Sequence, residues 1–275
     1  MRKIHRRMLE FLVVVIFTVA FGVPFLFVIF SAGKSTAEAA TMAFSLPSSP
    51  QYLENFREVF RAGGGMVLRG FYNSVRLTIF TILVLTVVSA MTGFVLERRR
   101  ERVGSLILFL IMTGLMLPPA VVPTIWILKG LGLYPTLLSM VMIEVALGFP
   151  FAVLLYRAFM ISIPRDLDEA ALIDGCGPLY LFFRIIFPLL KPVSVTIIIL
   201  TSINVYNDFV NPLYFLPGAE NVTIQLSLYN FQTQFHTRWN LLFADVLVIA
   251  VPPFLFYLFF RRQIVEGMVA GAIKA

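Results

Sequence analysis

Apolar residues follow one another along this chain in long runs, without the alternating or amphipathic patterns of a soluble protein. Six runs reach about 20 residues, the length of helix that crosses the hydrocarbon core of a bilayer. They cover residues 11–30, 77–96, 106–128, 137–156, 193–213 and 241–260. The pattern predicts an all-α integral membrane protein with six transmembrane helices.

Two places interrupt this helical pattern. The third run contains Pro118, Pro119 and Pro123, which predict a kinked or broken helix, tolerated in a membrane only where protein or water satisfies the freed backbone groups. Before the second run, apolar residues recur at helical spacing over 52–60 and give way to glycines at 63–65. We expect a short amphipathic helix on the outer surface that ends at these glycines.

Composition supports a membrane protein and excludes several other classes. Of the 275 residues, 59% are hydrophobic and 13% charged, whereas soluble domains carry about 25% charged residues. The single cysteine, Cys176, excludes an internal disulfide, and His5 and His236 lie too far apart in sequence to suggest a zinc site. The net charge of +7 comes from basic residues at the ends of apolar runs. This placement indicates membrane topology and no nucleic-acid partner.

The distribution of Lys and Arg predicts the orientation of the spans. With the N-terminus inside, 15 of the 22 basic residues lie on cytoplasmic flanks and seven on the other side, as expected for a positive-inside bias. Both termini are then cytoplasmic. The basic front of the first run also fits a signal peptide, but the apolar stretch exceeds the roughly 7–15 residues of such signals. We therefore expect an uncleaved span.

The loop at residues 157–192 is predicted to be cytoplasmic and to join the fourth and fifth spans. Pro164 fits the first turn of a helix, and Asp166, Asp168 and Glu169 place negative charge near the positive helix end. Gly175 is a plausible helix stop. The result is a short helix with one charged face and one small, apolar face. Either a docking surface for another protein or an ordinary connecting helix explains these residues.

The motif Glu169-Ala170-Ala171, followed by Gly175, Ile185 and Pro188, resembles the EAA loop of bacterial ATP-binding-cassette importers. The pair Asn73 and Ser74, together with the C-terminal segment 266–274, resembles the carbohydrate branch that contains the maltose permease subunits. Two mild departures are Phe187, where the motif usually has Leu, and Ala275, where a final Gly is common.

The resemblance implies a permease subunit of an ATP-driven, binding-protein-dependent importer of a sugar or oligosaccharide, in a bacterial or archaeal cytoplasmic membrane. Its implied partners are a second permease subunit in a heterodimer, a dimer of ATPase subunits, an extracytoplasmic solute-binding protein and the lipid bilayer. This chain carries no G-x-x-x-x-G-K-[ST] phosphate loop. We expect ATP and magnesium to be bound by the ATPase subunits, and no cofactor or catalytic residue here.

The resemblance also assigns residues to coupling. The expected ATPase contact is formed by Asp168, Glu169, Ala170, Ala171, Asp174, Gly175 and Pro188. A C-terminal tail that reaches the ATPase dimer interface would use Gly267, Gly271, Ala272 and Lys274. Without the resemblance, a frayed terminus or a helix-packing glycine pair would explain the tail equally well.

Polar residues within apolar runs are functional candidates because they are costly in hydrocarbon. The candidates for the translocation path are Glu144, Asn204, Tyr206, Asn207 and Asp208. For Asp208, and for Asp245 in the sixth run, a place at the aqueous rim is as compatible with the sequence as substrate contact. Glu144 could instead pair with a neighbouring helix, and Asn and Tyr also hold helices together.

Three segments are expected: a first span with its external segment at 1–70, a permease core at 71–265 and a cytoplasmic tail at 266–275. Two alternatives to a sugar permease remain. A permease of a non-sugar importer shares the loop, whereas a stand-alone secondary transporter leaves the Glu169–Gly175 motif unexplained. A membrane enzyme lacks any catalytic constellation in this sequence.

Overall fold

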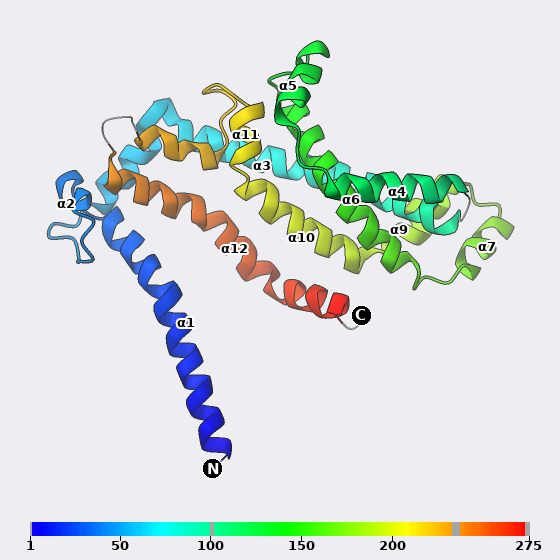
Figure 1. Cartoon of the computed structure of the whole chain (residues 1–275), viewed down its shortest axis with the longest axis horizontal. Helices are drawn as coiled ribbons and strands as arrows, with labels where there is room; N and C mark the ends of the chain where they lie inside the picture. Colours follow the sequence, from blue (N-terminus) through cyan, green and yellow to red (C-terminus); the bar gives the residue numbers. More distant parts are fainter. Residues whose placement is uncertain (1, 100–101, 233–236, 273–275) are drawn as a thin grey trace. The chain divides into compact units, whose positions relative to one another are not determined.

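The computed structural model describes residues 2–99, 102–232 and 237–272, with the backbone alone at residues 2–7, 9, 230 and 263–272. This part of the chain is almost entirely helical (Figure 1). The long helices are α1 (Arg2–Ala32), α3 (Tyr52–Arg98), α6 (Leu137–Met160) and α12 (Trp239–Ala272). Shorter helices are α2 (Thr36–Ala40), α4 (Arg102–Met116), α5 (Val121–Gly130), α7 (Asp166–Ile173), α10 (Lys191–Asn207) and α11 (Val210–Phe215).

Four further elements are single turns or less regular helices. Two one-turn helices, α8 (Pro178–Tyr180) and α9 (Phe187–Leu189), flank the π-helix η1 (Leu181–Ile186). Pro188 has no N–H to bond the carbonyl four residues earlier, which disfavours regular α-helical bonding over this stretch. The 3-10 helix η2 spans Ile224–Phe231.

Four helices in the described part are long and apolar enough to cross a membrane, and the number rises to six if each of two bent helix pairs counts as one span. One pair is α4 with α5, bent by 118°. The bend contains Pro118 and Pro119, so the predicted break of the third run is confirmed. The other pair is the stretch Pro178–Leu189 with α10, bent by 77°.

The helix breaks at the glycines 63–65, as the sequence predicts. Backbone dihedrals are non-helical from Ala62 to Gly65, with φ of 56°, 63° and 80° at the three glycines, so the predicted break is confirmed. Only residues without a Cβ adopt these angles at little cost.

The fifth run, by contrast, was expected to be one helix over 193–213. That expectation is wrong, because α10 ends at Asn207 and α11 begins at Val210.

The chain forms two compact units, each described by itself. The first contains Met1–Phe71 and Ile224–Phe254, and the second contains Tyr72–Thr223 and Leu255–Ala275. The expected segments at 1–70, 71–265 and 266–275 stay a prediction.

Buried polar contacts tie the first unit together where α1 ends. The buried Lys34 ammonium donates to the carbonyl of Ala43 at 2.6 Å. The Asn55 amide donates to the carbonyls of Ala32 and Lys34 at 2.8 and 2.9 Å. Asn240, at the start of α12, donates to Asn55 Oδ1 at 3.0 Å. The two bonds from Asn55 satisfy carbonyls left open at and just after the end of α1.

Asp245, also in the first unit, is fully buried. The Ser227 hydroxyl donates to its Oδ2 at 2.7 Å. A place at an aqueous rim, which the sequence left open for Asp245, does not fit this burial.

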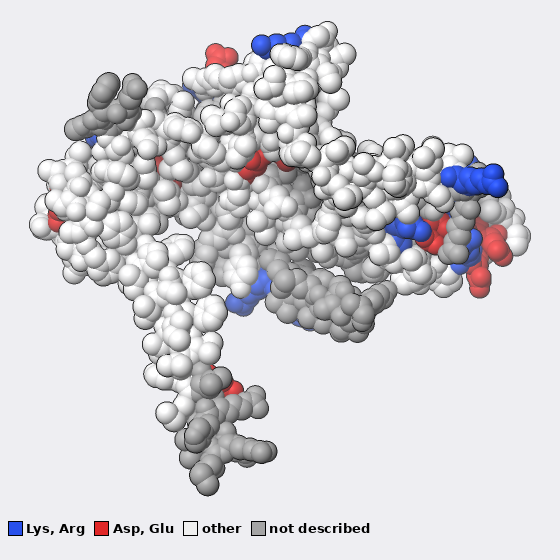
Figure 2. All heavy atoms as spheres, viewed as in Figure 1, with Lys and Arg blue, Asp and Glu red and all other residues white. Residues whose placement is uncertain are grey.

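The core of the second unit lies among α3, α6, η1 and α10. Buried residues in it include Leu85 of α3, Tyr156 of α6, Ile186 of η1 and Ile197 of α10. The Tyr156 hydroxyl donates to Ser194 Oγ at 2.8 Å, which joins α6 to α10 by a buried hydrogen bond. Around this core the visible surfaces of the helices are mostly uncharged, whereas charged side chains gather at the end where α7 lies (Figure 2).

Close packing of α3 on α6 generates the first prediction. A Cβ at Gly93 would lie 2.9 Å from the Tyr156 Cβ and 3.1 Å from the Arg157 backbone nitrogen, whereas a Cβ at Gly130 would meet nothing within 4 Å. Gly93→Val should therefore cost about 1–3 kcal/mol through overpacking, and Gly130→Val should be nearly neutral. The thermal midpoints of the purified variants in detergent test this. Equal midpoints for the two variants would contradict the packing.

Candidate functional site

The helix α7 begins and ends as its sequence dictates. Its first turn carries Asp166, Asp168 and Glu169, where negative charge stabilises the positive end of the helix. Its C-terminal end is closed by bonds from Gly175 N to Leu172 O at 3.0 Å and from Cys176 N to Ala171 O at 2.9 Å.

Gly175, with φ of 77°, takes the left-handed conformation that this type of helix ending requires. The predicted helix and its stop at Gly175 are confirmed. The sequence suggested that Pro164 lies in the first turn of this helix. That expectation is wrong, because Pro164 precedes the helix by two residues.

One face of α7 packs on the second unit and the other is exposed. Ala171 is buried against Leu181, Phe182 and Ile186 of η1. On the other side Ile173 is 86% exposed, and the motif residues Glu169, Ala170, Asp174 and Gly175 are exposed as well. Apolar and acidic side chains are therefore exposed together on this side of α7.

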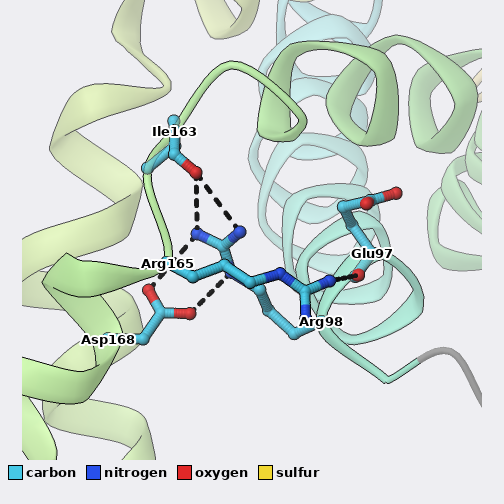
Figure 3. Close-up of polar contacts among 5 residues, drawn as sticks. All are labelled: Glu97, Arg98, Ile163, Arg165 and Asp168. Carbon is cyan, nitrogen blue, oxygen red and sulfur yellow. Dashed lines mark hydrogen bonds and ion pairs between the residues drawn. The ribbon is translucent and has the colours of Figure 1, made fainter.

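Asp168 points away from this exposed face and pairs with Arg98 at the end of α3. Arg98 Nε lies 2.6 Å from Asp168 Oδ2, and the two side chains are only 12% and 14% exposed. Arg98 Nη2 also donates to Asp168 Oδ1 at 3.3 Å. Both terminal nitrogens of Arg98 donate to the Ile163 carbonyl at 3.3 Å (Figure 3).

Two more arginines bind Glu97, the neighbour of Arg98. Arg165 donates to the Glu97 backbone carbonyl at 3.0 Å (Figure 3). Arg157, near the end of α6, pairs with the buried Glu97 carboxylate at 3.3 Å. We call Glu97, Arg98, Arg157, Arg165 and Asp168 the arginine clamp. Its members join the end of α3 to the end of α6 and to α7.

Pro188, the last of the expected coupling residues, lies in α9 and is exposed. Two residues later the chain bends into α10. Of the seven expected coupling residues, the structure thus places four on the exposed side of α7, Ala171 in the core and Asp168 in the clamp, with Pro188 apart from them in sequence.

Asp208 lies in the break between α10 and α11 and caps the second of these helices. Its Oδ1 accepts hydrogen bonds from the backbone nitrogens of Val210 at 2.9 Å and Asn211 at 3.2 Å. Its Oδ2 accepts a bond from the Asn211 amide at 2.6 Å. Asp208 therefore satisfies backbone donors that the break leaves open.

The other candidates for the translocation path separate by exposure. Glu144 of α6 is buried and lies near Asp208 and Asn211. Tyr206 is also buried. Asn204 and Asn207 are exposed, and at a spacing of three they share one face of α10. The sequence grouped these residues, whereas the structure directs them to opposite sides of the helix.

The tail candidates fall largely outside what the structure describes. The backbone of α12 continues through Gly267, Gly271 and Ala272, but their surroundings lie outside the described residues, as does Lys274 entirely. Among the described residues there is no group of three or more His, Cys, Asp or Glu side chains that could hold a metal ion.

The clamp is the feature that the sequence did not reveal. Arg98, Arg157 and Arg165 were counted there only as markers of orientation. Their partners stand about 60–70 positions away, and no local pattern predicts such pairs. An acidic residue on a short helix, together with arginines at the ends of apolar runs, was the one available signal.

Comparison with known families identifies the class of this protein. Residues 85–268, more than half of the chain, match the family described as binding-protein-dependent transport system inner membrane component. The chain belongs to this family. It is a membrane permease component of an ABC importer and not the subunit that hydrolyses ATP.

Relatives match over most or all of the chain. It is 32% identical, over 278 residues and 100% of both chains, to the probable starch degradation products transport system permease protein AmyC of Thermoanaerobacterium thermosulfurigenes. It is 30% identical, over 80% of both chains, to the melibiose/raffinose/stachyose import permease protein MelC of Bacillus subtilis (strain 168). A crystal structure of a bacterial ABC transporter involved in the import of the acidic polysaccharide alginate shares the fold, with a TM-score of 0.80, 18% identity and coverage of 93% of this chain and 95% of that one.

The capping role of Asp208 generates the second prediction. Asp208→Ala removes the acceptor of three hydrogen bonds and should lower stability by about 1–2 kcal/mol, the typical cost of a lost helix cap. Asp208→Asn keeps one side-chain oxygen and should lose less. Thermal midpoints of the purified variants distinguish them, and an unchanged midpoint for Asp208→Ala would contradict the capping role.

Proposed function

We propose that this chain is a six-span permease subunit that forms half of the translocation pathway of a sugar or oligosaccharide importer. Two of the spans would be the bent pairs, which bring the number of candidate spans to six. The excess of Lys and Arg at one set of span ends supports cytoplasmic termini and a cytoplasmic α7. The membrane would be the cytoplasmic membrane of a bacterium or archaeon.

The names of the relatives support a carbohydrate substrate. AmyC is named for starch degradation products and MelC for melibiose, raffinose and stachyose, and both match this chain over most of its length. Neutral sugars are recognised by hydrogen-bonding amides and carboxylates beside aromatic faces, and such groups gather at the end of α10.

The exposed side of α7 is the single observation that carries the coupling role. The proposal is that a subunit of an ATPase dimer covers Ile173 together with Glu169, Ala170 and Asp174. ATP and magnesium would be bound by those ATPase subunits. A second permease and an extracytoplasmic solute-binding protein would complete the importer, and the tail residues Gly267, Gly271, Ala272 and Lys274 would reach the ATPase dimer interface.

The exposed asparagines of α10 carry the proposal for the path. Asn207 donates to the Ile203 carbonyl of its own helix at 2.9 Å, and polar side chains within a span are expensive where they face hydrocarbon. Asn204 and Asn207 are exposed on one face of an apolar helix. We therefore assign this face to water or to the second permease subunit and not to lipid.

The third prediction tests the coupling surface. Glu169→Lys should leave the protein in the membrane but abolish sugar uptake, because the inverted charge would face a basic ATPase surface. Glu169→Gln is the matched control. It removes the charge without inverting it, and it should keep much of the uptake.

Uptake by cells or proteoliposomes, normalised to the amount of inserted protein, gives the measurement. Normal uptake by a correctly inserted Glu169→Lys protein would refute the coupling role of this residue.

The fourth prediction tests the proposed path. In a Cys176→Ala background, Asn207→Cys should react with a water-soluble thiol reagent, and the transported sugar should slow the reaction. Phe109→Cys, at an exposed position of the apolar helix α4, serves as the lipid-facing control and should stay unreactive.

Asn207→Ala should weaken transport about fivefold, since one hydrogen bond to a neutral sugar contributes about 1 kcal/mol. A cysteine at position 207 that is as unreactive as the one at position 109 would show that this face of α10 does not line a water-filled path.

A further inference from the structure

Arg98 makes more contacts than an ordinary basic residue at the end of a span. All three guanidinium nitrogens are engaged, Nε and Nη2 with Asp168 and both Nη atoms with the Ile163 carbonyl. A planar guanidinium fits such an arrangement, and a lysine ammonium does not. One side chain thus binds the first turn of α7 and the turn that leads into it.

Two further arginines, one near the end of α6 and one just before α7, make contacts with the end of α3. Arg165, just before α7, donates to the Glu97 carbonyl at the end of α3. Arg157, near the end of α6, pairs with the Glu97 side chain, which is only 4% exposed. Arginines on both sides of the turn between α6 and α7 therefore bind Glu97, the neighbour of Arg98 at the end of α3.

Burial decides how much the ion pair between Arg98 and Asp168 contributes to the attachment of α7. Exposed ion pairs contribute little, because water and salt screen them. Arg98 and Asp168 are largely shielded from solvent and are joined by an ion pair from Nε to Oδ2 and a hydrogen bond from Nη2 to Oδ1. Charge-assisted hydrogen bonds are about twice as strong as neutral ones. The loss of one partner would leave the other charge half-buried and unpaired, which makes the pair hard to separate.

We propose that Arg98 is a positioning residue of the transport cycle, which fixes α7 to the end of α3 so that the two move as one body. A movement imposed on α7 by the ATPase would then reach α3 directly, in addition to the connections through α6 and η1. Asp168 acts within this chain, as the partner of Arg98, and not as a contact to the ATPase. The proposal rests on the proposed function, because it requires α7 to be the coupling helix.

The experiment uses the complete importer, reconstituted with its ATPase subunits, second permease and binding protein. The sugar transported and the ATP hydrolysed are measured together. Arg98→Ala should let ATP hydrolysis continue while the sugar transported per ATP falls about tenfold, as expected when a charged hydrogen-bonded contact is lost. Arg99→Ala removes the same charge from the exposed neighbouring residue and should leave the ratio unchanged.

Two further variants separate positioning from simple stability. Arg98→Lys keeps the positive charge but loses the planar guanidinium group. Its ratio of sugar transported to ATP hydrolysed should lie between those of Arg98→Ala and the unmodified complex. Arg98→Asp combined with Asp168→Arg re-forms the pair with its charges exchanged, and should raise the ratio above that of either single variant. A fall in ATP hydrolysis and transport by the same factor, an unchanged ratio in Arg98→Ala, or no gain in the double variant would overturn the proposal.

Asp168→Asn keeps the test decisive if Arg98→Ala does not assemble, because it weakens the same pair without altering α3. The same fall in the ratio is expected, and an unchanged ratio in assembled Asp168→Asn complexes would overturn the proposal. The proposed function is judged separately, by whether the unmodified complex transports sugar at the expense of ATP.

Discussion

Peptide groups inside a bilayer find no water to bond, so each must be satisfied within the protein. This constraint explains why the described part of the chain is almost wholly helical, and also what happens where helices break. At the end of α1, amides of Asn55 reach the open carbonyls. Between α10 and α11, the carboxylate of Asp208 accepts from the first nitrogens of the new helix. Polar side chains at such breaks form hydrogen bonds with backbone groups that the helices leave unpaired, which is a structural role.

The same reasoning changes how intramembrane polar residues are interpreted. Asp208 lies in the break between α10 and α11, where it caps the second helix, and the buried Glu144 lies near it. Asn204 and Asn207 lie on an exposed face of α10. A charged residue in a span is therefore not by itself a mark of the transport path. Its neighbours and the face it occupies decide between a structural role and a functional one.

Two kinds of contact, apolar packing and polar bonds to arginines, hold α7 in place. Apolar packing of Ala171 on η1 fixes where the helix lies, and the arginine clamp fixes how it is attached to the ends of α3 and α6. Apolar contacts are non-directional, whereas the ion pair and the hydrogen bonds of Arg98 set a particular orientation. The combination leaves one face of α7 exposed in a defined direction.

The sequence by itself determined the features that depend on neighbouring residues. Long apolar runs predicted the helices, prolines and glycines predicted two breaks, and Gly175 predicted the end of α7, because each follows from local sterics or hydrogen bonding. The spaced motif identified the family. Tertiary structure alone decided that Asp168 turns inward to Arg98, that Tyr206 is buried while Asn207 is exposed, and that the fifth run divides at Asp208. These outcomes depend on which side chains meet across 60 to 70 positions of sequence and on which face each helix buries, and packing alone sets both.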